Sequence, residues 1–265
     1  MGESTSDNPF KSIDEVVTYI KESRQSVSYH QMVSPDTRVF ALGETHNMIG
    51  SRIEAVIALD EFYKLGFTHL GIEMLDTSMQ KILDKYCVDG TGREEIYSHL
   101  DRNFRWIVSS ADEYMQIIDK AKSLGMKIIA LDLPSEQRNV LPREEILRKR
   151  DEEMAKRTMD VLNESDSNKV VTFSGKVHAG YTGTVMTQLL RKSGIEVVSA
   201  HIIGDSDTTG YLEEAALQAG VSNERFMFTA RARFPKSKTA PSADFVIHLP
   251  QINKNQSNLI LLNQI

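Results

Sequence analysis

The sequence predicts an α/β protein with a mainly parallel central sheet and helices on both of its faces. Short apolar runs rich in Val and Ile alternate along the chain with longer amphipathic stretches. A repeat of this kind forms a parallel sheet, because right-handed crossovers place helices on both faces. Several amphipathic stretches end at Gly66, Gly125 or Gly194, where glycine suits a left-handed helix cap. With 265 residues, 40 % of them hydrophobic, the chain can bury one large core.

The order of elements follows from the spacing of apolar residues. A leading helix is expected over residues 11–32, behind a cap at Ser12. Five strands are expected at residues 37–43, 68–74, 126–132, 169–175 and 195–201. The amphipathic stretches that predict helices are residues 51–65, 76–86, 110–124, 143–163 and 181–193.

Two further regions complete the single α/β domain that we expect over residues 11–265. Residues 89–110, which contain Trp106, are expected to form a small helical insertion or lid. The last part of the chain predicts strands near residues 225–230, 244–248 and 258–262. In residues 225–238, basic residues interleave with Phe side chains, which is typical of an edge strand with a solvated basic side and a packed aromatic side.

Residues 1–10 are expected to be a disordered leader, because they are polar, rich in Ser and Thr and without periodicity. They match the pattern for myristoylation of Gly2, although Glu3 suits that pattern poorly, so acylation stays open. We find no secretory signal peptide and no apolar run of the roughly 18 to 20 residues that span a bilayer.

Composition excludes several functions. The formal net charge of −6 argues against nucleic-acid binding, which needs a basic face. The single cysteine, Cys87, excludes an intrachain disulfide and a cysteine-rich zinc site. The chain also lacks a G-x-S-x-G elbow, a Walker A lysine and a G-x-G-x-x-G loop after the first strand, so acyl-enzyme and nucleotide-binding functions have little support.

Polar residues follow the predicted strands at the points where they end. In open parallel sheets the ligand crevice lies at the carboxyl ends of the strands, so we expect these side chains to converge. Glu44 and His46 stand out, because two ionisable groups beside Gly43 in an apolar setting require partners or a function. The other strand-end residues are Glu73, Asp132, Lys176, His178 and His201.

Some of these residues have an ordinary structural explanation. Asp132 is as consistent with a helix or turn cap as with a ligand. His201 is expected to be a rim residue with a satisfied hydrogen bond. Structural or surface roles are expected for four histidines that have no acidic partner at a corresponding position: His30, His69, His99 and His248.

The chemistry of the strand-end residues allows two routes to hydrolysis, and the sequence leaves both open. In one, Glu44, His46, Glu73 and His178 bind a divalent metal such as zinc, manganese or cobalt, which activates water. In the other, His46 takes a proton from water without a metal. Glu44 or Glu73 orients its imidazole, and His178 or an arginine steadies the oxyanion.

Four motifs occur in the order and spacing of a known superfamily: LGETHN at 42–47, GIEM at 71–74, RKRDEEMAKR at 148–157 and GKVHAG at 175–180. Over about residues 40–200 the chain resembles the superfamily that contains erythromycin esterase, the ChaN-like haem-binding proteins and the Tiki/TraB group. The resemblance implies an α/β fold with a pocket at the strand ends. The functional positions it implies are Glu44, His46, Glu73, Arg150, Asp151 and His178.

The chain departs from this family pattern at several positions. Gly175 stands where the esterase members have an additional histidine, and Arg52 is the nearest counterpart of their early arginine. The haem binders use a tyrosine ligand. Tyr114 and Tyr181 are available here, but no motif singles out either one.

Our first functional hypothesis is therefore a hydrolase-like bacterial effector, esterase-like or resembling a metal-dependent protease, that acts on a small molecule or a peptide. Similar folds occur among type III effectors of plant-pathogenic bacteria, and this implies delivery into the host-cell cytoplasm, with the bacterial cytoplasm as the alternative. A second hypothesis is a non-catalytic protein that binds haem or a metal. A third is a pseudoenzyme effector that a host protein recognises.

Overall fold

The computed structural model describes residue 10 and residues 12–103, 111–180, 183–204, 211–230 and 243–250. Within these ranges seven strands form one sheet in the order β3-β2-β4-β1-β5-β7-β6. All neighbouring strands are parallel except β6, which pairs antiparallel with β7. The predicted mainly parallel sheet is therefore confirmed. The strands are β1 (Val39–Glu44), β2 (His69–Asp76), β3 (Lys127–Asp132), β4 (Val170–Gly175), β5 (Val197–Ile203), β6 (Phe226–Thr229) and β7 (Phe245–His248).

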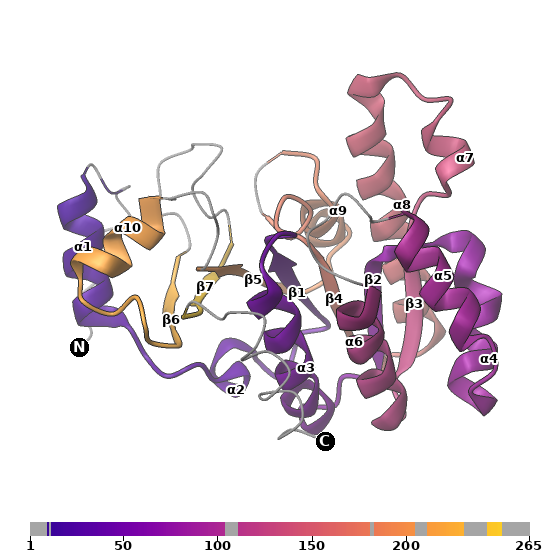
Figure 1. Ribbon diagram of the computed structural model, residues 1–265, viewed down its shortest axis with the longest axis horizontal. Coiled ribbons are helices and arrows are strands. Elements are labelled where there is room, and N and C mark those ends of the chain that lie inside the picture. Colours follow the sequence, from indigo (N-terminus) through magenta and orange to yellow (C-terminus); the bar gives the residue numbers. More distant parts are fainter. Residues whose placement is uncertain are drawn as a thin grey trace.

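Helices cover both faces of the sheet. On one face lie α3 (Ile49–Lys64) and α6 (Ala111–Ser123), and on the other lie α8 (Arg143–Glu164) and α9 (Met186–Lys192) (Figure 1). Successive side chains of β1 enter opposite clusters: Phe40 and Leu42 pack with the first pair, and Val39 and Ala41 with the second. Because β1 is buried on both faces, its sequence is a continuous apolar run rather than an alternating one.

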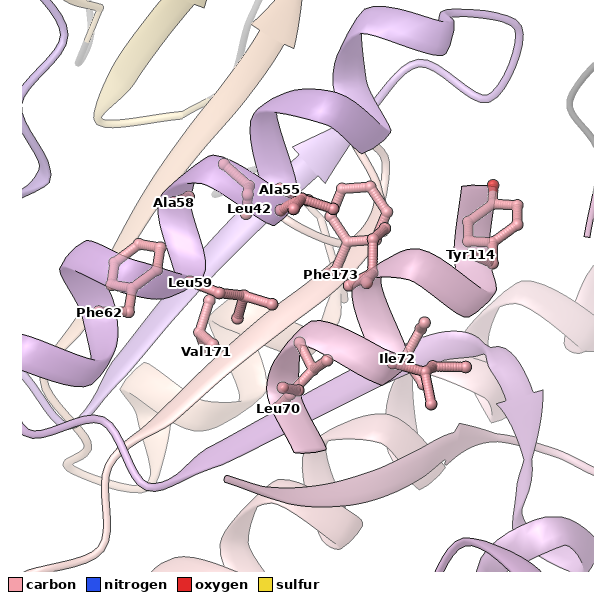
Figure 2. Packing of buried hydrophobic residues seen from close by; sticks show 14 of the residues in the cluster. Leu42, Ala55, Ala58, Leu59, Phe62, Leu70, Ile72, Tyr114, Val171 and Phe173 are labelled. Atoms are coloured by element: carbon pink, nitrogen blue, oxygen red, sulfur yellow. The ribbon is translucent and has the colours of Figure 1, made fainter. Parts of the chain in front are cut away.

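Helix α3 lies directly on the centre of the sheet. Figure 2 shows its Leu59 and Phe62 beside Leu42 and Val171, and all of these residues belong to the largest hydrophobic cluster. Helix α3 also packs against α6. This double coverage buries polar residues of α3 as well, including Arg52 and Glu54, which are 1 % and 2 % exposed.

The remaining helices lie at the two ends of the sheet (Figure 1). Beside β3 are the 3-10 helix η1 (Thr77–Met79), α4 (Gln80–Asp89) and α5 (Arg93–Asn103). Beside β6 are α1 (Ile13–Ser23) and α10 (Tyr211–Gln218). Helix α7 (Ser135–Arg138) and the start of α8 project beyond the body of the molecule. No helix in the described ranges is both long enough and apolar enough to span a bilayer.

One sequence prediction needs correction. The leading helix does not run from 11 to 32: α1 ends at Ser23, and a separate short helix, α2, covers Tyr29–Met32. Between them Gln25 exchanges two backbone hydrogen bonds with Met227, at 2.9 and 2.8 Å, and so covers the edge strand β6. The edge strand predicted near residues 225–230 forms as β6, with Phe226 and Phe228 buried and Arg225 exposed, and Arg225 also pairs with the buried Glu54.

Other predictions fall partly outside the described residues. Of the predicted leader, only Phe10 is described, and it is buried at 7 % exposure. Helix α5 forms the described part of the predicted insertion, whereas residues 104–110 with Trp106 lie outside. Three further predictions lie outside the described residues: the strand at 258–262, the basic stretch from residue 231 to 238, and Tyr181.

Candidate active site at the carboxyl edge of the sheet

The strand-end residues meet at the carboxyl edge of the sheet. Strand β1 is central and pairs in parallel register with β4, so that Glu44 lies opposite Gly175. Strand β2 lies on the other side of β4 and carries Glu73 near its end. Strand β3 pairs with β2 and ends at Asp132. The parallel direction of these four strands therefore brings polar residues from distant parts of the chain to one border.

One group of charges surrounds Glu44, which is 1 % exposed. Its Oε1 accepts a hydrogen bond from the Tyr114 hydroxyl at 2.7 Å and lies 3.0 Å from His46 Nδ1. Its Oε2 accepts a hydrogen bond from Arg52 Nη1 at 3.1 Å. Arg52 also donates to the His46 carbonyl oxygen at 2.8 Å and, through Nε, to Glu113 Oε2 at 3.2 Å. We call Glu44, His46, Arg52, Glu113 and Tyr114 the Glu44 network.

A second group surrounds Glu73, which is 2 % exposed. Arg150 donates to Glu73 and also holds Asp132, with Nε 2.8 Å from Oδ1. His178 lies between two carboxylates: its Nε2 is 3.4 Å from Glu73 Oε1 and its Nδ1 is 2.9 Å from Asp151 Oδ1. We call Glu73, Asp132, Arg150, Asp151 and His178 the Glu73 network.

Asp151 joins three segments of the chain. It lies on α8 and bonds His178 in the loop after β4, and its Oδ1 also accepts the backbone N–H of Met186 at 2.7 Å. Met186 is the first residue of α9. The RKRDEEMAKR motif is therefore not only a solvated helix with surface ion pairs, because its Arg150 and Asp151 turn towards the strand ends.

Gly175 brings the two networks together. Its backbone N–H donates to Glu73 Oε2 at 2.5 Å. A Cβ added at this glycine would lie 2.8 Å from His46 Nε2 and 3.4 Å from Glu73 Oε2. The His46 ring therefore lies against the Gly175 backbone, with its Nε2 edge close to Glu73. Only a residue without a side chain leaves room for this arrangement.

Burial and neighbouring charges set the protonation states. Burial lowers the pKa of His46, but its hydrogen bond to Glu44 and the charges of Glu44 and Glu73 outweigh this, so the net pKa is raised. Burial also opposes the charged form of His178, yet Glu73 and Asp151 raise its pKa to about 10. Burial raises the pKa of Glu73, but His178 and Arg150 bring it well below its usual range. At neutral pH His178 is thus an imidazolium and Glu73 a carboxylate.

All six predicted functional residues lie in these two networks. Structural or surface roles were predicted for four other histidines, and the structure describes the partners of three of them. Within the described residues His69 bonds the Thr68 hydroxyl, and His248 bonds a backbone carbonyl. His99 has an acidic neighbour that the sequence did not indicate: its Nε2 lies 3.6 Å from Asp76 Oδ2, because β2 continues past Glu73 to meet α5. A structural role for His99 stays a prediction.

Four residues of the networks were missed or undervalued. Asp132 is no simple cap, since it binds both Arg138 and Arg150. Arg52 of α3 and Tyr114 of α6 reach Glu44, and Glu113 of α6 binds Arg52. A lone arginine in an apolar helix, eight residues after Glu44, was the available signal for Arg52.

The predicted metal ligands do not fit a metal site. In the part of the chain that the structure describes, no three His, Cys, Asp or Glu side chains are placed to hold a metal ion. The physical reason is that the carboxylates already have partners: Glu44 accepts from Arg52 and Tyr114, and Glu73 from Arg150 and the Gly175 backbone. Two of these donors are arginines, so the carboxylate oxygens that would bind a metal ion are already bound to cations and other donors.

Substituting Gly175 by Ala is expected to lower the free energy of unfolding by about 1 to 3 kcal/mol, because the new methyl group would overlap His46 Nε2. Urea unfolding measures this loss. The same substitution in a His46→Ala background should cost much less, since the overlapping atom is then gone. An equal loss in both backgrounds would show that another neighbour, not His46, limits the space.

The fold and the two networks define a class: α/β proteins with a charged cluster at the carboxyl edge of a parallel sheet. Residues 33–149 match the family model described as haem-binding uptake, Tiki superfamily, ChaN. The ChaN-like resemblance and fold predicted from the motifs are confirmed. The match ends one residue before Arg150, so Arg150, Asp151 and His178 lie beyond it.

Solved structures show the same fold at low sequence identity. The chain is similar to a succinoglycan biosynthesis protein (12 % identity, TM-score 0.66, covering 92 % of this chain and 98 % of that one). It is similar to the type III effector HopBA1 (9 %, TM-score 0.52, 95 % and 100 %). It is also similar to ChaN of Campylobacter jejuni, described with cofacial haem (14 %, TM-score 0.52, 84 % and 92 %). No curated protein matches the sequence.

The family description raises the question of haem. A tyrosine ligand must present its hydroxyl oxygen to the iron. Tyr114 does not fit this role, since it is 1 % exposed and its hydroxyl donates to Glu44. Among the described residues, the strand-end cluster therefore offers no tyrosine for haem iron.

Proposed function

We propose that the chain is a hydrolase-like effector in which His46 activates a water molecule without a metal ion. The observation that supports this most is the contrast in exposure within the cluster. The His46 side chain is 27 % exposed, whereas those of Glu44, Glu73 and His178 are 0 to 2 % exposed. A partly exposed imidazole backed by a buried carboxylate has the arrangement of a general base.

The two networks would share the work of such a reaction. With Nδ1–H donating to Glu44, the neutral His46 keeps a lone pair on Nε2 that can accept a proton from water. Glu44 cannot turn away, because Arg52 and Tyr114 hold its two oxygens. As Nε2 takes the proton, Glu44 and the nearby Glu73 stabilise the imidazolium. Arg150 and His178 supply the positive charge that would steady an oxyanion.

The effector part of the proposal rests on the likeness to HopBA1 in fold. It implies delivery into a host cell, and a peptide or small molecule of that cell as the substrate.

The pH dependence of turnover tests the proposed base. With p-nitrophenyl acetate as the probe, the rate should rise with pH, because only neutral His46 accepts a proton. Its midpoint should lie above 6.5, since the pKa of His46 is raised. Glu44→Gln removes the negative partner, so the midpoint should move to lower pH and the rate at the plateau should fall roughly tenfold or more.

Glu113→Gln is the matched control, because Glu113 binds Arg52 and makes no bond to the His46 ring nitrogens. Its pH midpoint should stay within a few tenths of the original. If Glu44→Gln and Glu113→Gln gave the same midpoint, Glu44 would not be the partner that tunes His46.

Haem binding is the second candidate, and the description of the matching family favours it. Titration with haemin, followed at the Soret band, distinguishes it from the first. A saturable spectral change that Tyr114→Phe leaves intact would place the iron ligand outside the described cluster. A flat titration removes this candidate.

A further inference from the structure

The carboxyl edge of the sheet also carries residues that the two networks leave unused. His201 is one of them. It is 4 % exposed and bonds the Lys176 backbone, but its Nε2 has no partner within the described ranges, so the predicted satisfied hydrogen bond is only half confirmed. The other unused residues are apolar and exposed: Leu147 (57 %), Val140 (82 %) and Val177 (60 %). Val140 follows Arg138 by two residues, and Val177 directly precedes His178.

Leu147 has the position of a buried residue on α8 but is not buried. The buried residues of this helix are Asp151, Met154, Ala155, Thr158 and Leu162. They follow Leu147 at the three-residue and four-residue spacings that define one helix face. Leu147 is nevertheless 57 % exposed, because the start of α8 projects beyond the body of the molecule (Figure 1). The inward face of α8 therefore continues past the edge of the sheet and is open to solvent at Leu147.

The exposed leucine stands one helical turn from charged groups of the Glu73 network. Arg150 and Asp151 follow Leu147 by three and four residues, so all three side chains leave α8 on the same side. At 1.5 Å of rise per residue, Leu147 lies roughly 4.5 to 6 Å farther along the helix axis. Arg150 donates to Glu73, and Asp151 binds His178. A carbonyl group held near Arg150 would thus have Leu147 a few carbon–carbon bonds away.

We propose that Leu147 and the overhanging face of α8 bind an aliphatic acyl group of the substrate, roughly four to eight carbons long. This inference rests on the proposed function and names the substrate class of that same site. The charged donors at the strand ends suit the carbonyl group, and the apolar side chain one turn away suits the tail. An acetyl group is too short to reach Leu147. A longer chain buries apolar surface there, and each buried CH₂ group strengthens binding roughly fourfold.

Two p-nitrophenyl esters that differ only in acyl length test the proposal. In the original protein kcat/KM should be about tenfold higher, or more, for the hexanoate than for the acetate. Leu147→Ser should lower this hexanoate-to-acetate ratio about fivefold, because it removes the apolar contact. Leu147→Met should keep the ratio, since the two side chains have similar volumes. An unchanged ratio in Leu147→Ser would overturn the proposal.

Leu217→Ser is the matched control for this substitution. Leu217 is also an exposed helical leucine, at 66 %, but it lies on α10 beside β6, at the opposite end of the sheet from α8. This variant should leave the ratio as it is. A fall as large as that in Leu147→Ser would also count against the proposal, because the effect would then not depend on the overhang.

A binding measurement separates this proposal from the proposed function. N-methylhexanamide carries the same acyl group on a stable amide, and N-methylacetamide is its short counterpart. In methyl NMR spectra of the full chain, the hexanamide should shift the Leu147 methyl signals saturably, and the acetamide should not. The Leu217 signals should stay in place with both compounds. A Leu147 shift without any ester turnover would uphold the acyl site while the hydrolase proposal fails.

Two results would overturn the acyl site and leave the hydrolase proposal untouched. One is a Leu147 methyl signal that N-methylhexanamide does not move, in a protein whose ester turnover depends on His46. The other comes from sedimentation of the original protein and Leu147→Ser. A dimer that the substitution converts to a monomer would show that a second copy of the chain covers this face.

Discussion

Replacing His46 by Ala is expected to remove ester turnover and leave the fold intact. A general base contributes roughly 100-fold to 10,000-fold to rate, so turnover of p-nitrophenyl acetate should fall by at least about 100-fold. Stability should change by no more than about 1 to 3 kcal/mol, the cost of one hydrogen bond to a charged group. The partly exposed ring leaves behind a Glu44 that still has Arg52 and Tyr114 as partners. Initial rates and urea unfolding on the same preparation measure both effects.

His30→Ala is the control for this experiment, because His30 is an exposed histidine on the short helix α2. It should change neither the rate nor the unfolding free energy. Turnover that survives in His46→Ala would end the proposal that His46 is the base. A large loss of stability in that variant would instead show a structural role.

The sheet could be predicted because burial on both faces leaves a clear mark in the sequence. All six positions of β1 and of β4 are buried, which produces the mostly apolar runs of these two strands. The leading helix could not be bounded in this way. Its end depends on Gln25 meeting Met227, two residues about 200 positions apart, and helical spacing carries no information about that contact.

The site could be predicted where it depends on strand ends, and not where it depends on helix packing. Glu44 and Glu73 follow from the rule that parallel strands share a carboxyl edge. Arg52 and Tyr114 reach Glu44 only because α3 and α6 pack against each other on one face. Amphipathic spacing predicts that these helices cover the sheet, but not which of their polar residues turn inward.

Gly175 shows how a single glycine shapes the site. The space beyond its Cα belongs to the His46 ring. A side chain at 175 and the present position of His46 exclude each other. The glycine therefore accounts for the contact between the two networks.

Replacing His178 by Ala is expected to have the largest effect on stability, a loss of about 3 to 5 kcal/mol at pH 6. His178 is the positive partner of both Glu73 and Asp151, and the three side chains are 2 to 6 % exposed. Its removal leaves buried negative charge near Asp151, whose Oδ1 then keeps, among the described residues, only the Met186 backbone N–H as a donor. Urea unfolding of the variant and the original protein at several pH values measures the loss.

The pH dependence distinguishes a lost charge from a lost side chain. The pKa of His178 is raised from 6.5 to about 10, so its stabilisation is fully present below about pH 6.5 and is lost as the pH rises through 10. The difference between the original protein and His178→Ala should therefore shrink between pH 6 and pH 10. His69→Ala is the control, since His69 is equally buried, has a lowered pKa and bonds only Thr68 among the described side chains. The cost of His69→Ala should not shrink over that interval, because a lowered pKa makes the contribution of His69 larger rather than smaller as the pH rises through 6.5. A His178→Ala cost that likewise failed to shrink would mean that packing, rather than the charge between two carboxylates, is what His178 contributes.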